Sequence, residues 1–232
     1  MKNLNTYIQE NTCINEKLIM THKNYTCAPT SRQELYSILM ERLHNNPNAN
    51  LNDIDVRNII DMSNIFYALD PHNIDISQWD VSDVRDMSGM FEDCRNFNAD
   101  LSLWDVSGVR YMGSMFKNCE RFNSELGGWD VSKVIFTGYM FENCNDFTSD
   151  LKNWDVSRVE SSAMMFKNCK NFNSDLSRWD VSNIRDMNYM FFNCIEFDSD
   201  LSDWNIAKVN NMDSTFYGCD SMKKIPDWYM KR

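Results

Sequence analysis

Cysteine is the residue type in this chain best suited to chemistry, and six of its eight cysteines recur every 25 residues. They are Cys94, Cys119, Cys144, Cys169, Cys194 and Cys219. A metal or redox site would need converging thiols, but the sequence has no CxxC pair and no histidine at ligand spacing from the series. Copies stacked about 5 Å apart would also have parallel rather than converging Cβ vectors. We therefore expect these cysteines to fill the core as small hydrophobic residues.

Two series of acidic residues share the 25-residue interval. One follows the tryptophans (Asp80, Asp105, Asp130, Asp155, Asp180) and the other precedes a leucine or isoleucine (Asp75, Asp100, Glu125, Asp150, Asp175, Asp200). Like charges stacked about 5 Å apart repel each other unless a cation or backbone N–H groups offset the repulsion. Calcium is one hypothesis, since it takes several oxygen ligands. The other is that each carboxylate accepts hydrogen bonds from turn amides of its own unit. With seven glycines the chain lacks the Gly-rich turns of calcium-binding β-helices, so we expect turn capping and no cofactor.

The other reactive residue types form no catalytic pattern. The three histidines (His22, His44, His72) are not repeated, and there is no Gly-rich phosphate loop followed by lysine, no GxSxG and no HExxH. A net charge of −11 without a Lys/Arg cluster argues against nucleic-acid binding. We expect no enzymatic activity.

These residues belong to an internal repeat, which must position them. The tryptophans Trp79, Trp104, Trp129, Trp154, Trp179 and Trp204 lie 25 residues apart, as do Phe66, Phe91, Phe116, Phe141, Phe166, Phe191 and Phe216. Seven units follow, beginning at Ile54 and at each of these six tryptophans, with degenerate first and last copies. Such units cannot bury their apolar faces alone, so they stack, and each recurring position becomes a column in the core.

The order of residues within a unit predicts its local structure. The serine three residues after each tryptophan, such as Ser82, is a favoured helix N-cap. Apolar residues then recur at helical spacing (Val84, Met87, Met90, Phe91, Cys94). The residue before the cysteine is Asp, Asn or Gly, which tolerate the left-handed conformation that ends helices. The run around Leu101, Trp104 and Val106 suits a strand. We predict an α/β repeat, a right-handed leucine-rich-repeat-like solenoid with one short strand and one short helix (partly 3₁₀) per unit.

The repeat "WDVSNIRDMNYMFFNCIEFDSDLSDW" (179–204) and its sister copies resemble the BspA-type leucine-rich repeat family, in the variant of mycoplasma surface lipoproteins. The resemblance covers about residues 51–225. It implies a solenoid that binds proteins or host surfaces, without a common enzymatic activity. Surface members usually carry secretion or lipoprotein signals, which this sequence lacks.

The flanks predict caps for the solenoid. Residues 1–50 form an N-terminal helical cap, in which Ser31 and Glu34 make a capping box and Leu35, Ile38, Leu39 and Leu43 share a face. Residues 226–232 close the other end, with Trp228 on the last unit of the 51–225 solenoid. Residues 1–12 are alternatively a targeting helix. No membrane span and no signal peptide are seen, so we expect a cytoplasmic or virion-associated protein, with the cell surface as the alternative.

Function is expected where the repeat varies. Large apolar residues replace polar ones on the presumed outer face of the middle units: Tyr111, Phe136, Tyr139, Met164, Tyr189 and Phe192. They form either an exposed surface for an unidentified protein partner or repacked core, because Thr137 and Ser162 replace core methionines beside Phe136 and Met164. We predict a non-enzymatic protein-binding scaffold. The alternatives are a phage structural or cargo protein with an N-terminal address helix, and a secreted surface adhesin.

Overall fold

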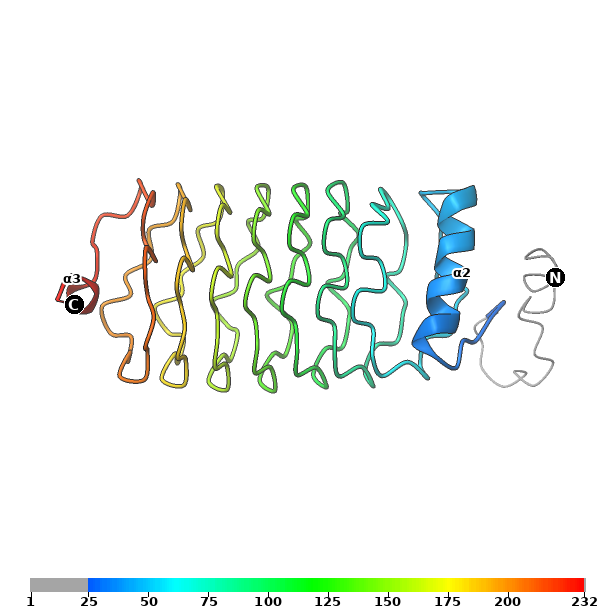
Figure 1. Cartoon of the computed structure of the whole chain (residues 1–232), viewed down its shortest axis with the longest axis horizontal. Coiled ribbons are helices and arrows are strands. Elements are labelled where there is room, and N and C mark those ends of the chain that lie inside the picture. Colours follow the sequence, from blue (N-terminus) through cyan, green and yellow to red (C-terminus); the bar gives the residue numbers. More distant parts are fainter. Residues whose placement is uncertain (1–24, 232) are drawn as a thin grey trace, which may run out of the picture.

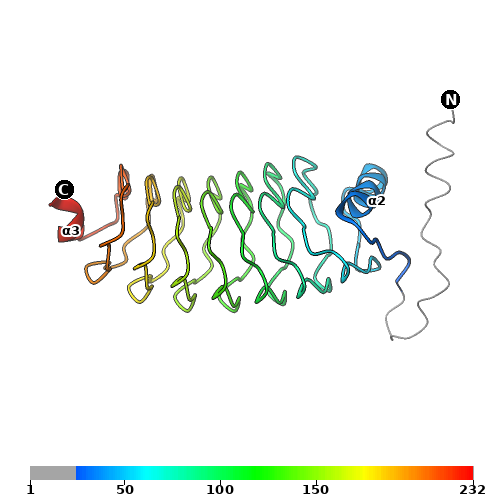
Figure 2. The ribbon, with the colours of Figure 1, turned by 60° about the horizontal axis from the view of Figure 1, so that its bottom comes forward.

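The computed structural model describes residues 25–231, in which the seven units stack in a row as a repeat solenoid (Figure 1). Helix α2 (Arg32–Asn45) lies at one end of the row and the short helix α3 (Asp227–Met230) lies at the other (Figures 1 and 2). The predicted stacking of units is confirmed. The predicted internal structure of the units is not.

The short helix predicted in each unit is wrong for the described residues. Two positions in every complete unit, the eleventh and the fifteenth counted from the tryptophan, have positive φ. In unit 2 these are Gly89 (61°) and Asp93 (63°). An α-helix needs right-handed φ and ψ at every residue, so a left-handed residue every fourth position reduces the segment to linked turns.

The backbone hydrogen bonds of this segment alternate between two directions. The N–H groups of Met87, Gly89 and Phe91 donate to carbonyls 24 residues later, in the next unit, at 2.8–2.9 Å. The N–H groups between them, of Met90 and Glu92, donate to carbonyls three residues earlier. Half of the N–H groups therefore join units and half close turns, which leaves neither a helix nor a regular sheet.

The predicted strand around Leu101, Trp104 and Val106 is also wrong. Trp104 N–H closes a turn onto the Leu101 carbonyl (3.1 Å), and Leu101 N–H donates to the hydroxyl of Ser124 in the next unit (2.9 Å). A turn every few residues prevents an extended chain. Among residues 25–231, the strand-like pairs between units are isolated parallel bridges at the eighth position, from Asp61↔Asp86 through Asp186↔Asn211.

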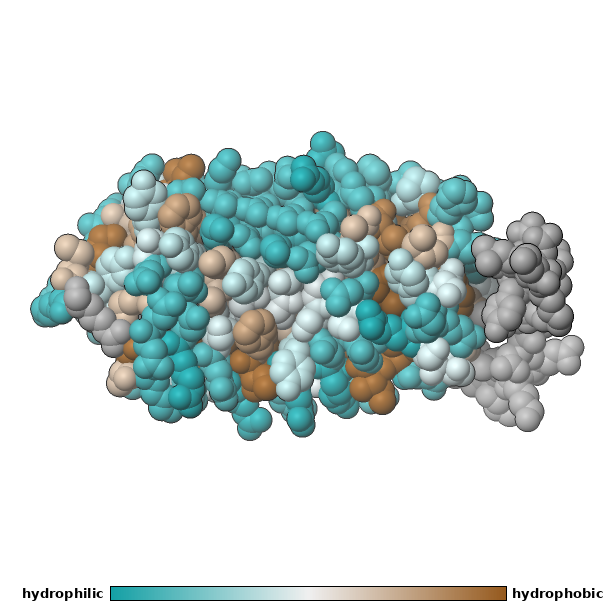
Figure 3. Space-filling model, in the orientation of Figure 1, coloured by the Kyte–Doolittle hydropathy of each residue, from teal (hydrophilic) through white to brown (hydrophobic). Residues whose placement is uncertain are grey.

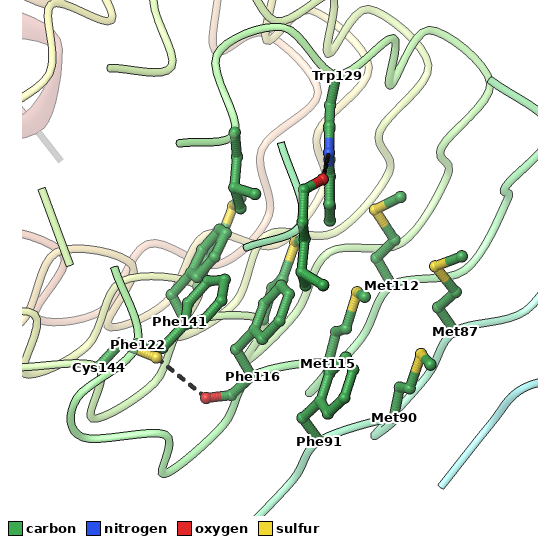
Figure 4. Packing of buried hydrophobic residues seen from close by; sticks show 14 of the residues in the cluster. Met87, Met90, Phe91, Met112, Met115, Phe116, Phe122, Trp129, Phe141 and Cys144 are labelled. Atoms are coloured by element: carbon green, nitrogen blue, oxygen red, sulfur yellow. Dashed lines mark hydrogen bonds between the residues drawn. The ribbon is translucent and has the colours of Figure 1, made fainter. Parts of the chain in front are cut away.

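The core consists of columns of identical side chains. The recurring tryptophans, phenylalanines, leucines and cysteines are all at most 8% exposed. Equivalent rings of successive units stack nearly parallel, with centroids 5.6 Å apart for Phe116 and Phe141. A second phenylalanine column packs beside the first, with Phe116 and Phe122 3.9 Å apart (Figure 4). Each unit buries its apolar residues against one another and against those of the neighbouring units, as in a solenoid.

Both ends of the row are covered. Helix α2 begins at the N-cap Ser31, whose hydroxyl accepts a hydrogen bond from Glu34 N–H, and it buries Leu35 and Leu39. At the other end Trp228 of α3 occupies the place of a further tryptophan. Its ring stacks on Trp204 at 6.4 Å, and its indole N–H donates to the Leu201 carbonyl at 2.9 Å.

Candidate functional site

The cysteine column is part of the structural framework. Each of the six thiols lies within 3.1 Å of a phenylalanine carbonyl 28 residues earlier, as in the pair Cys144 Sγ–Phe116 O at 3.0 Å (Figure 4). Burial raises the pKa of Cys94 and Cys219 to about 12, and it raises the pKa of the four thiols between them as well. Thiolates are the reactive form of cysteine, so these thiols are chemically inert at neutral pH.

The acidic series cap turns. The carboxylate of Asp105 accepts a hydrogen bond from Ser107 N–H at 3.0 Å, and equivalent bonds recur in both series. The hydroxyl and N–H of the following serine hold the pKa of Asp105 and of Asp130 below its usual value. The serine was predicted to cap a helix, but its own N–H donates a hydrogen bond to the aspartate two residues earlier. The aspartate therefore caps the turn.

Within residues 25–231, no group of three or more His, Cys, Asp or Glu side chains has an arrangement suited to a metal ion. One oxygen of most aspartates in the two series already accepts a hydrogen bond from a turn amide. In the same part of the chain, no helix has the length and apolar character needed to cross a membrane.

An asparagine column at the fifteenth position was missed by the sequence analysis. The amide groups of Asn118, Asn143, Asn168 and Asn193 each donate to the side-chain oxygen one unit earlier, starting at Asp93, over 2.5–3.0 Å. Together with Arg95, Glu120, Asn145 and Lys170 they line a polar groove of about 520 Å³. The sequence shows this column as asparagines 25 residues apart. Their left-handed conformation was expected, but their mutual hydrogen bonding was not.

The six large apolar residues singled out in the sequence all reach the surface. Tyr111 and Phe136 are 41% and 38% exposed, and Tyr139, Met164, Tyr189 and Phe192 are half-buried. The buried Thr137 and Ser162 beside them hydrogen-bond to each other at 3.2 Å. Figure 3 shows one face of the molecule as mostly hydrophilic, with hydrophobic residues in separate spots. The six residues fall in three columns, at the eighth, eleventh and fourteenth positions of the units.

Column 11 is the column of left-handed residues. It contains Asn64, Gly89 and Ser114 in units 1 to 3, Tyr139, Met164 and Tyr189 in units 4 to 6, and Ser214 in unit 7. The three large residues have φ of 63°, 56° and 52°. A left-handed conformation costs a residue with a Cβ roughly 1–2 kcal/mol, and short polar side chains tolerate it best. A bulky residue at such a position is therefore an outlier that needs a reason.

Column 8 contains a second replacement. The Asp86 carboxylate accepts a hydrogen bond from Ser88 N–H at 2.8 Å, whereas units 3 and 4 replace this Asp-x-Ser pair with Tyr111-x-Gly113 and Phe136-x-Gly138. Neither glycine has positive φ. A Cβ at Gly138 would lie 2.9 Å from Cζ of Phe136, and one at Gly113 would overlap the same ring. The glycines thus let the Phe136 ring lie over the backbone, where it lines an open groove of about 460 Å³ with Tyr111.

Column 14 carries charges in the middle and aromatic rings toward the end. Lys117 pairs with Glu92 at 2.9 Å and Lys167 pairs with Glu142 at 2.8 Å, so the signs alternate over four units. In units 6 and 7 the column continues as Phe192 and Tyr217, whose rings stack at 5.0 Å. Phe192 also contacts Tyr189 of column 11 at 5.5 Å, which shows that the two columns share one face.

The stacked 25-residue units, with a uniform core and variable outer columns, define a solenoid repeat protein. The family model described as "Mycoplasma protein of unknown function, DUF285" matches residues 36–151 and 135–232, and the chain belongs to this family. Among solved structures, the "Crystal structure of TLR13-ssRNA13 complex" is similar over 87% of this chain at 10% identity and a TM-score of 0.31. The chain spans 39% of the length of that structure. No curated protein matches the sequence.

Proposed function

We propose that the chain is a non-enzymatic scaffold that binds a protein through the face formed by columns 8, 11 and 14. The observation that carries the proposal is the left-handed conformation of Tyr139, Met164 and Tyr189 in three successive units. Asn, Gly and Ser occupy the same column in the other units, so the fold does not require large side chains there. Since these residues are half-buried rather than core, contact with a partner is the reason that we assign to them.

The resemblance to BspA-type repeats, which bind proteins or host surfaces, supports this proposal. So does the placement of the variable residues, since solenoids bind partners through extended surfaces that vary from unit to unit. The aromatic residues of these columns, beside the charged residues of column 14, are also of the types found in protein interfaces.

A site-specific photo-crosslinker tests the proposal. A benzophenone side chain at position 164, in cells that produce the chain, should form a defined protein adduct that mass spectrometry identifies. The same group at position 103, where Leu103 is 85% exposed away from the three columns, is the matched control. Equal labelling from both positions, or no protein adduct from position 164, would remove the support for a binding face.

A further inference from the structure

The side-chain sizes in column 11 are complementary when two copies of the chain are set antiparallel to each other. Its small residues lie in units 1 to 3 and its large residues in units 4 to 6. A two-fold axis perpendicular to the solenoid, between units 3 and 4, places unit 3 of one copy opposite unit 4 of another, unit 2 opposite unit 5 and unit 1 opposite unit 6. Every large residue then faces a small one: Tyr139 faces Ser114, Met164 faces Gly89, and Tyr189 faces Asn64.

Column 14 is complementary about the same axis. Glu92 of one copy faces Lys167 of the other, and Lys117 faces Glu142, so opposite charges meet at four places. The side chains of Lys117 and Lys167 are 30% and 27% exposed, whereas those of Glu92 and Glu142 are 19% and 9% exposed. Each ammonium has donors beyond the one used within its own chain, so the lysines are the groups that reach across. Farther out, the exposed ring of Tyr67 faces Phe192.

The seventh and eighth positions add two favourable pairs and one unfavourable pair. Arg85 faces Glu160, and both side chains are largely exposed, at 44% and 63%. Tyr111 faces Phe136 next to the axis, where rings can stack. Asp61 faces Asp186 at the rim, with Arg185 beside it. Opposite charges thus outnumber like charges in this register.

Other registers lose this match. With the axis through unit 3, Glu92 faces Glu142, and with the axis through unit 4, Lys117 faces Lys167. An axis between units 4 and 5 sets Tyr139 against Met164, two large side chains, and pairs only Tyr189 with a small residue, Ser114. Charge thus disfavours an axis through unit 3 or unit 4, and side-chain size disfavours an axis between units 4 and 5.

We propose that the partner of this face is a second copy of the chain, docked antiparallel about an axis between units 3 and 4. The inference rests on the proposed function and names its partner. An isologous interface of this kind must be self-complementary, which is the pattern in columns 11 and 14. A strip six rungs long at about 4.8 Å per rung and roughly 15–20 Å wide buries on the order of 500 Å² per copy, which reaches the lower limit for a specific interface.

The small area implies a weak dimer, with a dissociation constant on the order of micromolar. Each copy carries a net charge of −11, so the two copies repel each other at long range. Salt screens this repulsion more than it screens partly buried contact pairs. We therefore expect stronger association in 0.15 M than in 0.01 M salt.

Analytical ultracentrifugation of the full chain over about 1–100 μM, a range that brackets the expected affinity, is the first test. We expect a monomer–dimer equilibrium, which the combined substitution Tyr139→Asn, Met164→Asn and Tyr189→Asn abolishes without lowering the melting temperature. Leu103→Asn, the control at an exposed apolar residue away from the face, should leave the equilibrium unchanged. A monomer throughout the range would overturn the inference, and so would a dimer that survives the triple substitution.

A charge exchange tests the register. Arg85 and Glu160 lie three units apart in one chain and face each other only across the proposed axis. Arg85→Glu and Glu160→Arg should each weaken the dimer about 5- to 30-fold, and the double variant should restore it, because two exposed pairs are lost and then regained. Additive weakening would overturn the register. A monomeric chain whose position-164 crosslinker labels a different protein would refute the self-association but leave the proposed function intact.

Discussion

The indole N–H of Trp129 donates a hydrogen bond to the carbonyl oxygen of Leu101, 28 residues earlier, at 3.0 Å. The Cys119 thiol makes the equivalent bond to the Phe91 carbonyl, also 28 residues earlier and at 3.0 Å. Each interval is one 25-residue repeat plus one three-residue turn, because each acceptor lies one repeat before the residue that closes a turn with the tryptophan or the cysteine, Leu126 and Phe116 respectively. The apolar part of each side chain fills the core while its single polar atom joins turns that lie one repeat apart.

Trp129→Phe should therefore destabilise the solenoid through two effects. It removes the bond to Leu101 O and leaves a small cavity, which together lower the free energy of unfolding by about 2–3 kcal/mol. Urea denaturation followed by far-UV circular dichroism measures the loss. Lys133→Ala, at an exposed position in the same unit, is the control and should change stability by less than about 0.5 kcal/mol. Equal effects of the two substitutions would contradict the role assigned to the tryptophan.

The sequence was sufficient to predict the stacking of units because the periodicity of Trp, Phe and Cys reports burial directly. It was not sufficient to predict the path of the chain within a unit. The spacing of Val84, Met87, Met90 and Cys94 fits a helix and a series of linked turns equally well. The left-handed conformation at Gly89 distinguishes the linked turns from a helix, and Tyr139 has the same conformation in the same column. Propensity opposes that conformation for tyrosine, so stacking against neighbouring units decides it.

The column cysteines should resist alkylation in the folded chain. Burial raises the pKa of Cys94 to about 12, so almost no thiolate is present at pH 8. We expect iodoacetamide to leave the six column cysteines unmodified in buffer and to modify all six in denaturant, as measured by peptide mass spectrometry. The protonated thiols also stabilise the folded chain, because their folded pKa values are raised. This stabilisation is complete below the unfolded pKa near 9 and is lost as the pH rises through the folded pKa values. Rapid labelling of Cys144 in buffer would contradict this.

Acid should weaken the fold through the capping aspartates. Serine hydroxyls and N–H groups lower the folded pKa of Asp105, Asp130 and Asp180 below the ordinary value of 3.8. A lowered folded pKa means that the contribution is present above the unfolded value and is lost as the pH falls through the folded value. We therefore expect the melting temperature to fall from about pH 5 toward pH 2.

Unit 7 provides the matched variant for this pH dependence, because Asn205 replaces the aspartate there and its amide oxygen accepts a hydrogen bond from Ala207 N–H at 3.2 Å. Asparagine keeps the acceptor and removes the titration. Asp105→Asn, Asp130→Asn and Asp180→Asn together should flatten the acid dependence while changing the melting temperature at pH 7 only slightly. An unchanged acid profile would mean that other carboxylates dominate it.

Position 138 should require glycine because a side chain there would collide with the Phe136 ring, and not because the backbone is left-handed. Gly138→Ser introduces a Cβ into the space occupied by the ring and should lower the free energy of unfolding by about 1–2 kcal/mol. Adding Phe136→Asp removes the ring and recreates the Asp-x-Ser turn of Asp86 and Ser88, so the double variant should recover most of the loss. A coupling of at least about 1 kcal/mol in urea denaturation is expected. Additive effects would contradict the packing of the ring on the glycine.

Tyr139→Asn should stabilise the isolated chain. Asn64 holds the same column at a φ of 55°, close to the 63° of Tyr139, and asparagine tolerates this conformation. The change removes the contact between the Tyr139 ring and Lys117 Nζ, which lie 5.8 Å apart. An exposed contact of this kind contributes about 0.5–1 kcal/mol, less than the strain of roughly 1–2 kcal/mol that is relieved. We expect a net gain in the free energy of unfolding of about 0.5–1 kcal/mol, measured by urea denaturation at a concentration well below that of dimer formation.

Tyr139→Phe is the control: it keeps both the backbone strain and the ring, so it should leave stability unchanged. If Tyr139→Asn lowers stability instead, packing within the chain is sufficient to explain the tyrosine, and the main argument for a binding face at column 11 is lost.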